Sequence, residues 1–167
     1  MKKLKIFVWI AMLFILQLTL AHYLTVSGIE AMFILPFIAA FALLEEDFRY
    51  TVMVGAICGI CTGSLMGYNF FLSMVFILLS AIVAFNLKKR PLYMPHFIKS
   101  CIWTALLSLI WETMAFFTSY FDFTQYSEIF ISHILIAVIY NTFMVIIIYP
   151  LLKKTIYEKE KQRKLII

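Results

Sequence analysis

The sequence predicts an all-α integral membrane protein in which six transmembrane helices form a compact bundle. The first reason is composition, because 64% of the 167 residues are hydrophobic and 14% are charged. A soluble domain has about 45–50% apolar and about 25% charged residues, and a chain this short has too little interior to hide such an excess from water. The second reason is that apolar runs long enough to cross a bilayer recur along the chain. We therefore expect lipid to surround most of it.

Six apolar stretches reach or approach the length of about 20 residues that a transmembrane helix needs. They cover residues of about 6–24, 29–44, 50–67, 69–87, 97–120 and 129–151. The second stretch is the shortest and contains Glu30 and Pro36, so whether it crosses fully stays open. The uncharged stretch 50–87 would form a single helix of about 57 Å, nearly twice the thickness of the hydrocarbon. It must therefore fold back, and Gly67-Tyr68-Asn69 provides turn-forming residues.

The basic residues predict the orientation of these spans. All 14 lysines and arginines lie in the segments 1–5, 45–49, 88–99 and 152–167. Positively charged loops stay on the cytoplasmic side, so we expect six spans with both ends in the cytoplasm and one domain over residues 1–167. The basic tail, 152–167, either lies on the anionic inner leaflet or is a frayed anchor. The net charge of +5 thus reflects topology and gives no indication of nucleic-acid binding.

Glycines recur at every fourth position in the third stretch, "GAICGICTGSLMG". Gly55, Gly59 and Gly63 share one face of a helix, whereas Gly67 belongs to the predicted turn. Small residues let membrane helices approach closely, and this approach drives their association. The glycine face therefore predicts tight helix packing, either within the chain or against a partner or a second copy.

Four polar side chains fall at membrane depth and are the candidate site residues: Gln17, Glu112, His133 and Asn141. The helical rise, counted from the expected membrane surfaces, places Gln17, Glu112 and Asn141 at a similar depth in the membrane. His133 is expected to lie closer to the outer surface. They could form one polar cluster between the first, fifth and sixth spans. Such residues either hydrogen-bond between helices or mark a ligand or proton site, and both interpretations stay open.

We expect no catalysis and no cofactor. The chain has no HExxH sequence, no aspartate-rich metal motif and no P-loop. Cys58 and Cys61 have the spacing of a redox or metal site, but they lie in an apolar run without a basic neighbour. A reactive thiolate needs an accessible, electropositive site, so small packing residues are the expected role and no metal is predicted.

Several segments together resemble a known family. They are "LQLTLAHYL" with Gln17, the glycine-rich third span followed by "MGYNFFLSMVFILLSAIVAFNLKKR", "ALLSLIWETMAFF" with Glu112, and "IYNTFMVIIIYPLLKK" with Asn141 and Pro150. In these the chain resembles the bacterial rod-shape-determining protein MreD family. It departs from the family at 29–30, where proline and aspartate are frequent, and at 62–64, where an aspartate often follows the glycines.

The resemblance implies a non-catalytic, multi-pass subunit of the peptidoglycan elongation machinery in the bacterial cell membrane. Such a subunit maintains cell shape by binding an MreC-like single-span protein and other membrane proteins of the elongation complex. The glycine face and the first and last spans are then the expected contact surfaces. The family is also similar in fold to the substrate-binding subunits of energy-coupling-factor vitamin transporters, which gives the alternative function. The short outer loops and the bulky first span argue against that alternative.

Overall fold

The computed structural model describes residues 2–21, 23, 32–65, 70–89, 94–119 and 127–158, without the side chains of 65, 116–119, 127–130 and 158. In this part of the chain all regular secondary structure is helical. The elements are α1 (Lys2–Thr19), α2 (Ile34–Leu44), α3 (Phe48–Leu65), α4 (Phe70–Lys89), α5 (His96–Ser119), α6 (Ser127–Leu152) and a π-helical segment, η1 (Lys153–Glu158). The all-α class is confirmed for the described residues.

Three helices in the described part are long and apolar enough to cross a membrane. They are Phe70–Lys89, His96–Ala115 and Ile131–Tyr157. Helices α1 and α3 have 18 residues each, or about 27 Å, and α1 carries three lysines in its first turn. The six-span topology stays a prediction, and the expected turn at 67–69 lies outside the described residues.

Helix α2 is shorter than the span predicted over 29–44. Its 11 residues extend over about 16 Å, roughly half of a hydrocarbon layer. Pro36 is the third residue of the helix, where its missing N–H costs nothing because the first-turn donors have no partner within the helix. The proline therefore marks the beginning of α2 and does not interrupt a longer helix. Residues 29–31 lie outside the described part.

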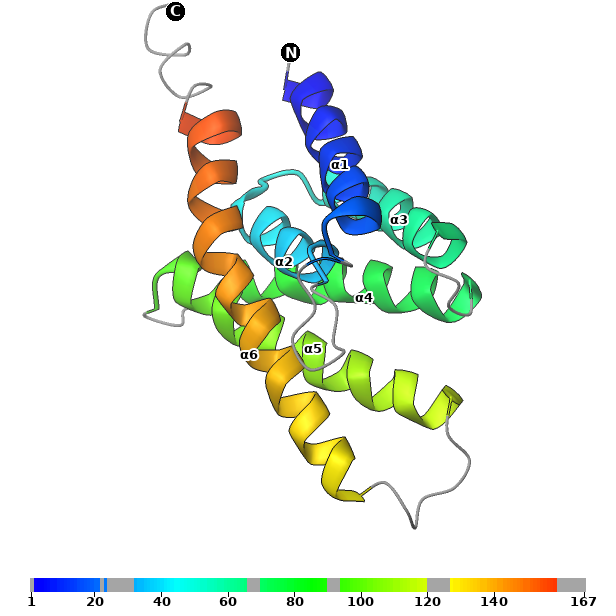
Figure 1. Ribbon diagram of the computed structural model, residues 1–167. Coiled ribbons are helices and arrows are strands. Elements are labelled where there is room, and N and C mark those ends of the chain that lie inside the picture. The colour runs from blue at the N-terminus through cyan, green and yellow to red at the C-terminus, as the bar shows by residue number, and fades with distance from the viewer. Residues whose placement is uncertain are drawn as a thin grey trace, which may run out of the picture.

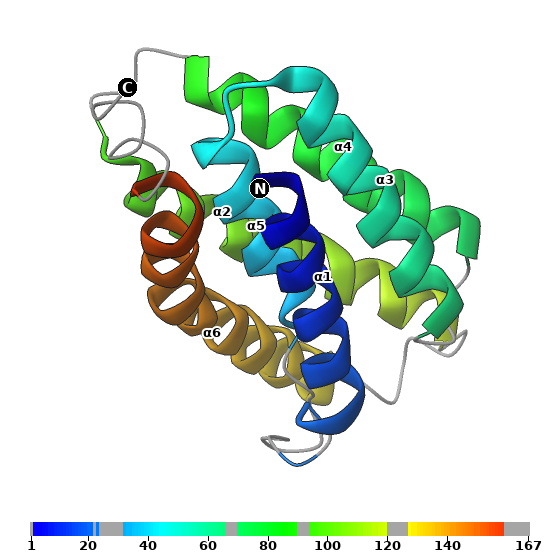
Figure 2. The same ribbon diagram turned by 90° about the horizontal axis from the view of Figure 1, so that it is seen from above.

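The core of the bundle lies around α2. Every residue from Ile34 to Leu43 is buried, and α2 contacts all five other α-helices. Figure 2 shows it enclosed by them. A helix that is apolar all round is stable only when it is surrounded, and α2 has no charged or hydrogen-bonding side chain. An all-apolar sequence suits either a membrane span or a protein interior, and the structure places α2 in the interior.

The beginning of α1 and the end of α6 lie at the same end of the bundle, in the upper part of Figure 1. There the Lys5 ammonium donates to the Thr155 carbonyl at 3.1 Å, and Trp9 Nε1 donates to Thr155 Oγ1 at 3.0 Å. The first residues of the predicted tail, 153–158, are therefore helical and bound to α1. Residues 159–167 lie outside the described part. Helices α3 and α4 are neighbours, and so are α5 and α6.

Candidate functional site

The glycine face packs against α4. A Cβ on Gly59 would lie 2.8 Å from the Met74 Cα and 2.9 Å from the Met74 carbonyl oxygen. On Gly55 it would lie 2.8 Å from the Ala81 Cβ, and on Gly63 it would lie 2.8 Å from the Cα of the first residue of α4. All three distances are shorter than real Cβ contacts, so only glycine allows this approach. The face is an interface within the chain, and a partner helix cannot occupy it at the same time.

Two of the four predicted polar residues meet at the beginning of α2. Gln17 Oε1 accepts the Phe33 N–H at 2.8 Å, and Asn141 Oδ1 accepts the Met32 N–H at 2.9 Å. The two side chains are 4% and 1% exposed, respectively. These bonds lie about 15 Å along α2 from its other end at Leu44, a distance of about half the thickness of a hydrocarbon layer.

These two amides compensate for the position at which α2 begins. The first N–H groups of a helix have no partner within it, and an unsatisfied N–H in hydrocarbon costs several kcal/mol. Phe33, which immediately precedes the helix, makes no side-chain capping bond. Carboxamide oxygens from α1 and α6 satisfy the two N–H groups that directly precede the helix, those of Met32 and Phe33, and they also fix both helices to α2.

The other two predicted residues form a separate pair between α5 and α6. His133 Nε2 lies 3.6 Å from Glu112 Oε2, and the side chains are 45% and 15% exposed. His133 lies two helical turns, or about 12 Å, from Asn141 along α6. The four residues are thus brought together as two pairs and not as one cluster. The glutamine and asparagine are buried at the centre, whereas the histidine is exposed.

A row of hydroxyls precedes Glu112 on α5. Ser100, Thr104 and Ser108 are fully buried, and their oxygens have no hydrogen-bond partner among the described residues. They follow one another at four-residue steps, on the face where α5 packs into the bundle. Small side chains at this spacing permit close helix contact, and the burial of the row is in keeping with packing of α5 into the bundle.

Sequence reasoning missed a polar cluster around Glu45, at the basic end of the bundle. Its Oε1 atom accepts hydrogen bonds from the Lys2 ammonium and from the Glu46 N–H, each at 3.0 Å. Its Oε2 atom accepts the Tyr157 hydroxyl at 3.0 Å, and its carbonyl accepts the Lys88 ammonium at 2.7 Å. The Glu45 side chain is 2% exposed. One residue thus joins α1, α4 and η1 to the segment between α2 and α3.

The segment "EEDFR" gave no signal for this role. Acidic residues contribute little to the orientation rule, and nothing in the spacing distinguishes Glu45 from the exposed Glu46. The one recognisable signal is Asp47, a typical N-cap residue, whose Oδ1 accepts the Arg49 N–H at 2.9 Å. That bond explains where α3 begins, but the burial of Glu45 depends on side chains more than forty residues away.

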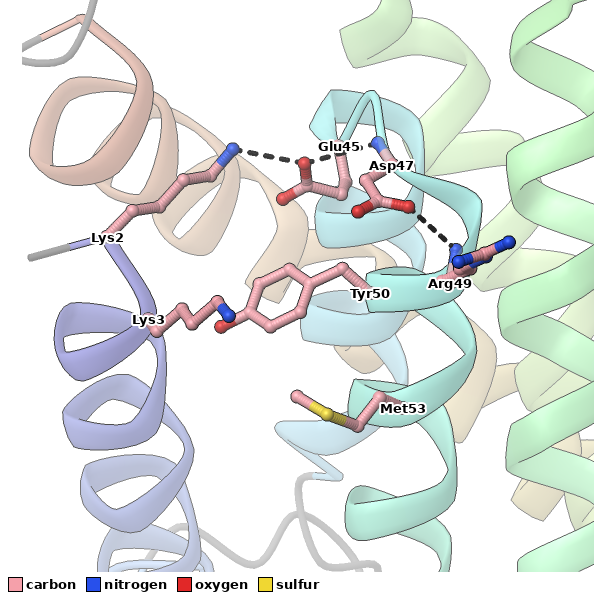
Figure 3. Close-up of a pocket in the computed structure, with 7 residues that line it drawn as sticks. All are labelled: Lys2, Lys3, Glu45, Asp47, Arg49, Tyr50 and Met53. Carbon is pink, nitrogen blue, oxygen red and sulfur yellow. Dashed lines mark hydrogen bonds and ion pairs between the residues drawn. The ribbon is translucent and has the colours of Figure 1, made fainter.

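An open hollow of about 640 Å³ lies beside this cluster, between the first turns of α1 and α3. Figure 3 shows its lining residues, which are Lys2, Lys3, Glu45, Asp47, Arg49, Tyr50 and Met53. Its basic side chains come from two helices. In Figure 3 Lys3 extends toward Tyr50, whereas the Arg49 side chain points away from α1. It is distinct from the central amides and from the Glu112–His133 pair.

The described part of the chain holds no group of three His, Cys, Asp or Glu side chains that could bind a metal ion. Cys58, Cys61 and Cys101 are free thiols. Comparison with protein-family models, with curated proteins and with solved structures finds no match to this chain.

Proposed function

We propose that the chain is a non-catalytic integral membrane subunit of the bacterial cell-elongation machinery, which builds lateral peptidoglycan. In this proposal it crosses the membrane six times, with both ends in the cytoplasm. It maintains cell shape by binding an MreC-like single-span protein. The starting point is the resemblance of its spans to the MreD family.

The observation that carries the proposal is the use of the interior polar groups. Gln17 and Asn141 accept hydrogen bonds from the backbone just before α2, and Glu45 accepts hydrogen bonds from Lys2 and Tyr157. A transport or catalytic site needs polar groups that are free to meet a substrate. In this bundle Gln17, Asn141 and Glu45 hold helices together, which suits a subunit that acts by presenting a fixed surface. The buried hydroxyls of α5 are not used in this way, because they have no partner among the described residues.

The contact surface is assigned to α6, since α4 covers the glycine face. Residues of α6 at four-residue steps form an exposed apolar stripe: Ile131, Leu135, Ile139, Phe143 and Ile147. The 26 residues of α6 extend over about 39 Å, which exceeds the membrane span of a partner helix. Because each four-residue step turns about 40° around the helix axis, the stripe winds around α6, and a single transmembrane helix would pack against it at a crossing angle. Helix α1 also has an exposed apolar side and is the second candidate, because the resemblance names the first and last spans. Helix α5 has a similar stripe, formed by Ile98, Ile102, Leu106 and Ile110.

The test is complementation in the bacterium that encodes the chain. Depletion is expected to make rod-shaped cells round, and the wild-type chain is expected to restore the rods. The Ile139→Trp variant should fail to restore rod shape even when its amount in the membrane equals that of the wild type, because the larger side chain displaces a partner helix. Leu106→Trp, on the exposed side of α5, is the matched control and should complement. Unchanged shape on depletion contradicts the proposal, and loss of vitamin uptake in its place would assign the chain to the transporter class.

A further inference from the structure

The hollow between α1 and α3 combines a cavity with an excess of unpaired positive charge. Lys3 and Arg49 are both exposed and line it from opposite helices. Neither makes an ion pair among the described residues. In Figure 3 the Lys3 side chain extends from α1 toward Tyr50, which offers a hydroxyl on the opposite wall.

The two carboxylates of the hollow offset part of this charge, since three cations and two carboxylates line it and leave a formal net charge of +1. Glu45 is buried, with its oxygens directed to Lys2, Tyr157 and neighbouring N–H groups. Asp47 accepts the Arg49 N–H and thereby caps α3. Both acids are therefore occupied by their own donors, whereas the ammonium of Lys3 and the guanidinium of Arg49 remain available.

The helix directions add to the positive potential. Both α1 and α3 begin at the hollow, and each is 18 residues long. The beginning of a helix carries about half a positive charge from its aligned peptide dipoles, and its free N–H groups favour an anion. At α3 carboxylates already accept the Glu46 and Arg49 N–H groups. The beginning of α1 and the cations of Lys3 and Arg49 therefore remain to act on this volume.

We propose that this hollow binds the phosphate group of an anion at the basic end of the bundle. An anionic phospholipid is the favoured source, because Met53, half-exposed one turn beyond Tyr50, adds an apolar side chain to the lining of the hollow. A headgroup between Lys3 and Arg49 would leave its acyl chains along α3. Basic pockets between membrane helices on the cytoplasmic side hold such headgroups. The inference rests on the membrane orientation given in the proposed function, and it does not depend on the partner protein.

The experiment measures lipid binding to the full chain in phosphatidylcholine nanodiscs. In one arm phosphatidylglycerol is added, and bound lipid is counted by native mass spectrometry. In the other arm inorganic phosphate is titrated by calorimetry without anionic lipid. Lys3→Gln and Arg49→Gln should each weaken phosphatidylglycerol binding about fivefold, and the double variant about thirtyfold. The control, Lys154→Gln, removes an exposed charge of η1 outside the hollow and should leave binding nearly unchanged.

The two arms distinguish the sources of the phosphate. Binding of inorganic phosphate that depends on Lys3 and Arg49 supports the phosphate site and assigns it to a soluble ligand. The inference is overturned if the wild-type chain neither prefers phosphatidylglycerol to phosphatidylcholine nor binds phosphate. It is also overturned if the double variant, with an unchanged melting temperature, binds as the wild type does.

Discussion

At the scale of single residues, the central feature is a pair of carboxamides that cap a helix beginning inside the bundle. Gln17 and Asn141 come from the first and last α-helices, and both bond the residues just before Ile34. Each oxygen satisfies an N–H that water cannot reach. The two side chains therefore fix where α2 begins, and their contribution is to the fold.

Replacing either carboxamide with a group of similar size should destabilise the protein. Gln17→Leu leaves the Phe33 N–H buried without a partner, which costs about 1–3 kcal/mol. Asn141→Leu leaves the Met32 N–H buried without a partner in the same way. Thermal unfolding in mild detergent measures both, with Thr19→Val as the control because that exposed hydroxyl bonds within α1. An unchanged melting temperature for both leucine variants would contradict the capping role.

At the scale of elements, the α3–α4 contact depends on the absence of single methyl groups. Gly55→Ala should destabilise the protein although alanine is the better helix former by about 1 kcal/mol. The new Cβ meets the Ala81 Cβ at 2.8 Å, and overpacking of this kind costs about 1–3 kcal/mol. The other neighbours of that Cβ are at 3.7 Å or more. Adding Ala81→Gly should therefore restore part of the lost stability in a thermal unfolding assay.

Gly59 provides the matched comparison. Its Cβ would meet backbone atoms of Met74, which no side-chain substitution can remove. Gly59→Ala should therefore be destabilising and should not be rescued by Ala81→Gly. Equal rescue of both glycine variants would show that the close approach is not the cause.

A second contact between elements depends on Glu45, which joins the two ends of the described chain. Glu45→Gln removes the charge that Lys2 neutralises and weakens the bond to Tyr157. A hydrogen bond to a charged group is worth about 1.5–3 kcal/mol, so stability should fall by about that amount. Limited proteolysis should also cut faster near η1. Glu46→Gln, at an exposed neighbour, should change neither measurement.

At the scale of the whole molecule, the helical class and four of the helices follow from the sequence. The stretches 50–67 and 69–87 correspond to Phe48–Leu65 and Phe70–Lys89, because long apolar runs specify helices regardless of their neighbours. The beginning of α2 and the burial of Glu45 could not be predicted. Both depend on side chains from distant parts of the chain, and a single sequence gives no distances between them.

The orientation of the bundle is open to a labelling test. Single-cysteine variants Glu46→Cys and Gln125→Cys, made without the native cysteines, should react differently with a membrane-impermeant maleimide. In spheroplasts the variant at 125 should be labelled at once, and the variant at 46 after permeabilisation, because basic segments remain in the cytoplasm. The reverse pattern would contradict the six-span topology with cytoplasmic ends.

The central claim is that this membrane bundle works by binding another protein of the cell-elongation machinery. Its most direct test is purification of the tagged chain in mild detergent, with mass spectrometry of the retained proteins and small molecules. We predict recovery of a single-span protein with a large external domain that acts in wall synthesis, and loss of it in Ile139→Trp but not in Leu106→Trp. Recovery of an ATPase module with a coupling subunit, or of a bound vitamin, would contradict the claim.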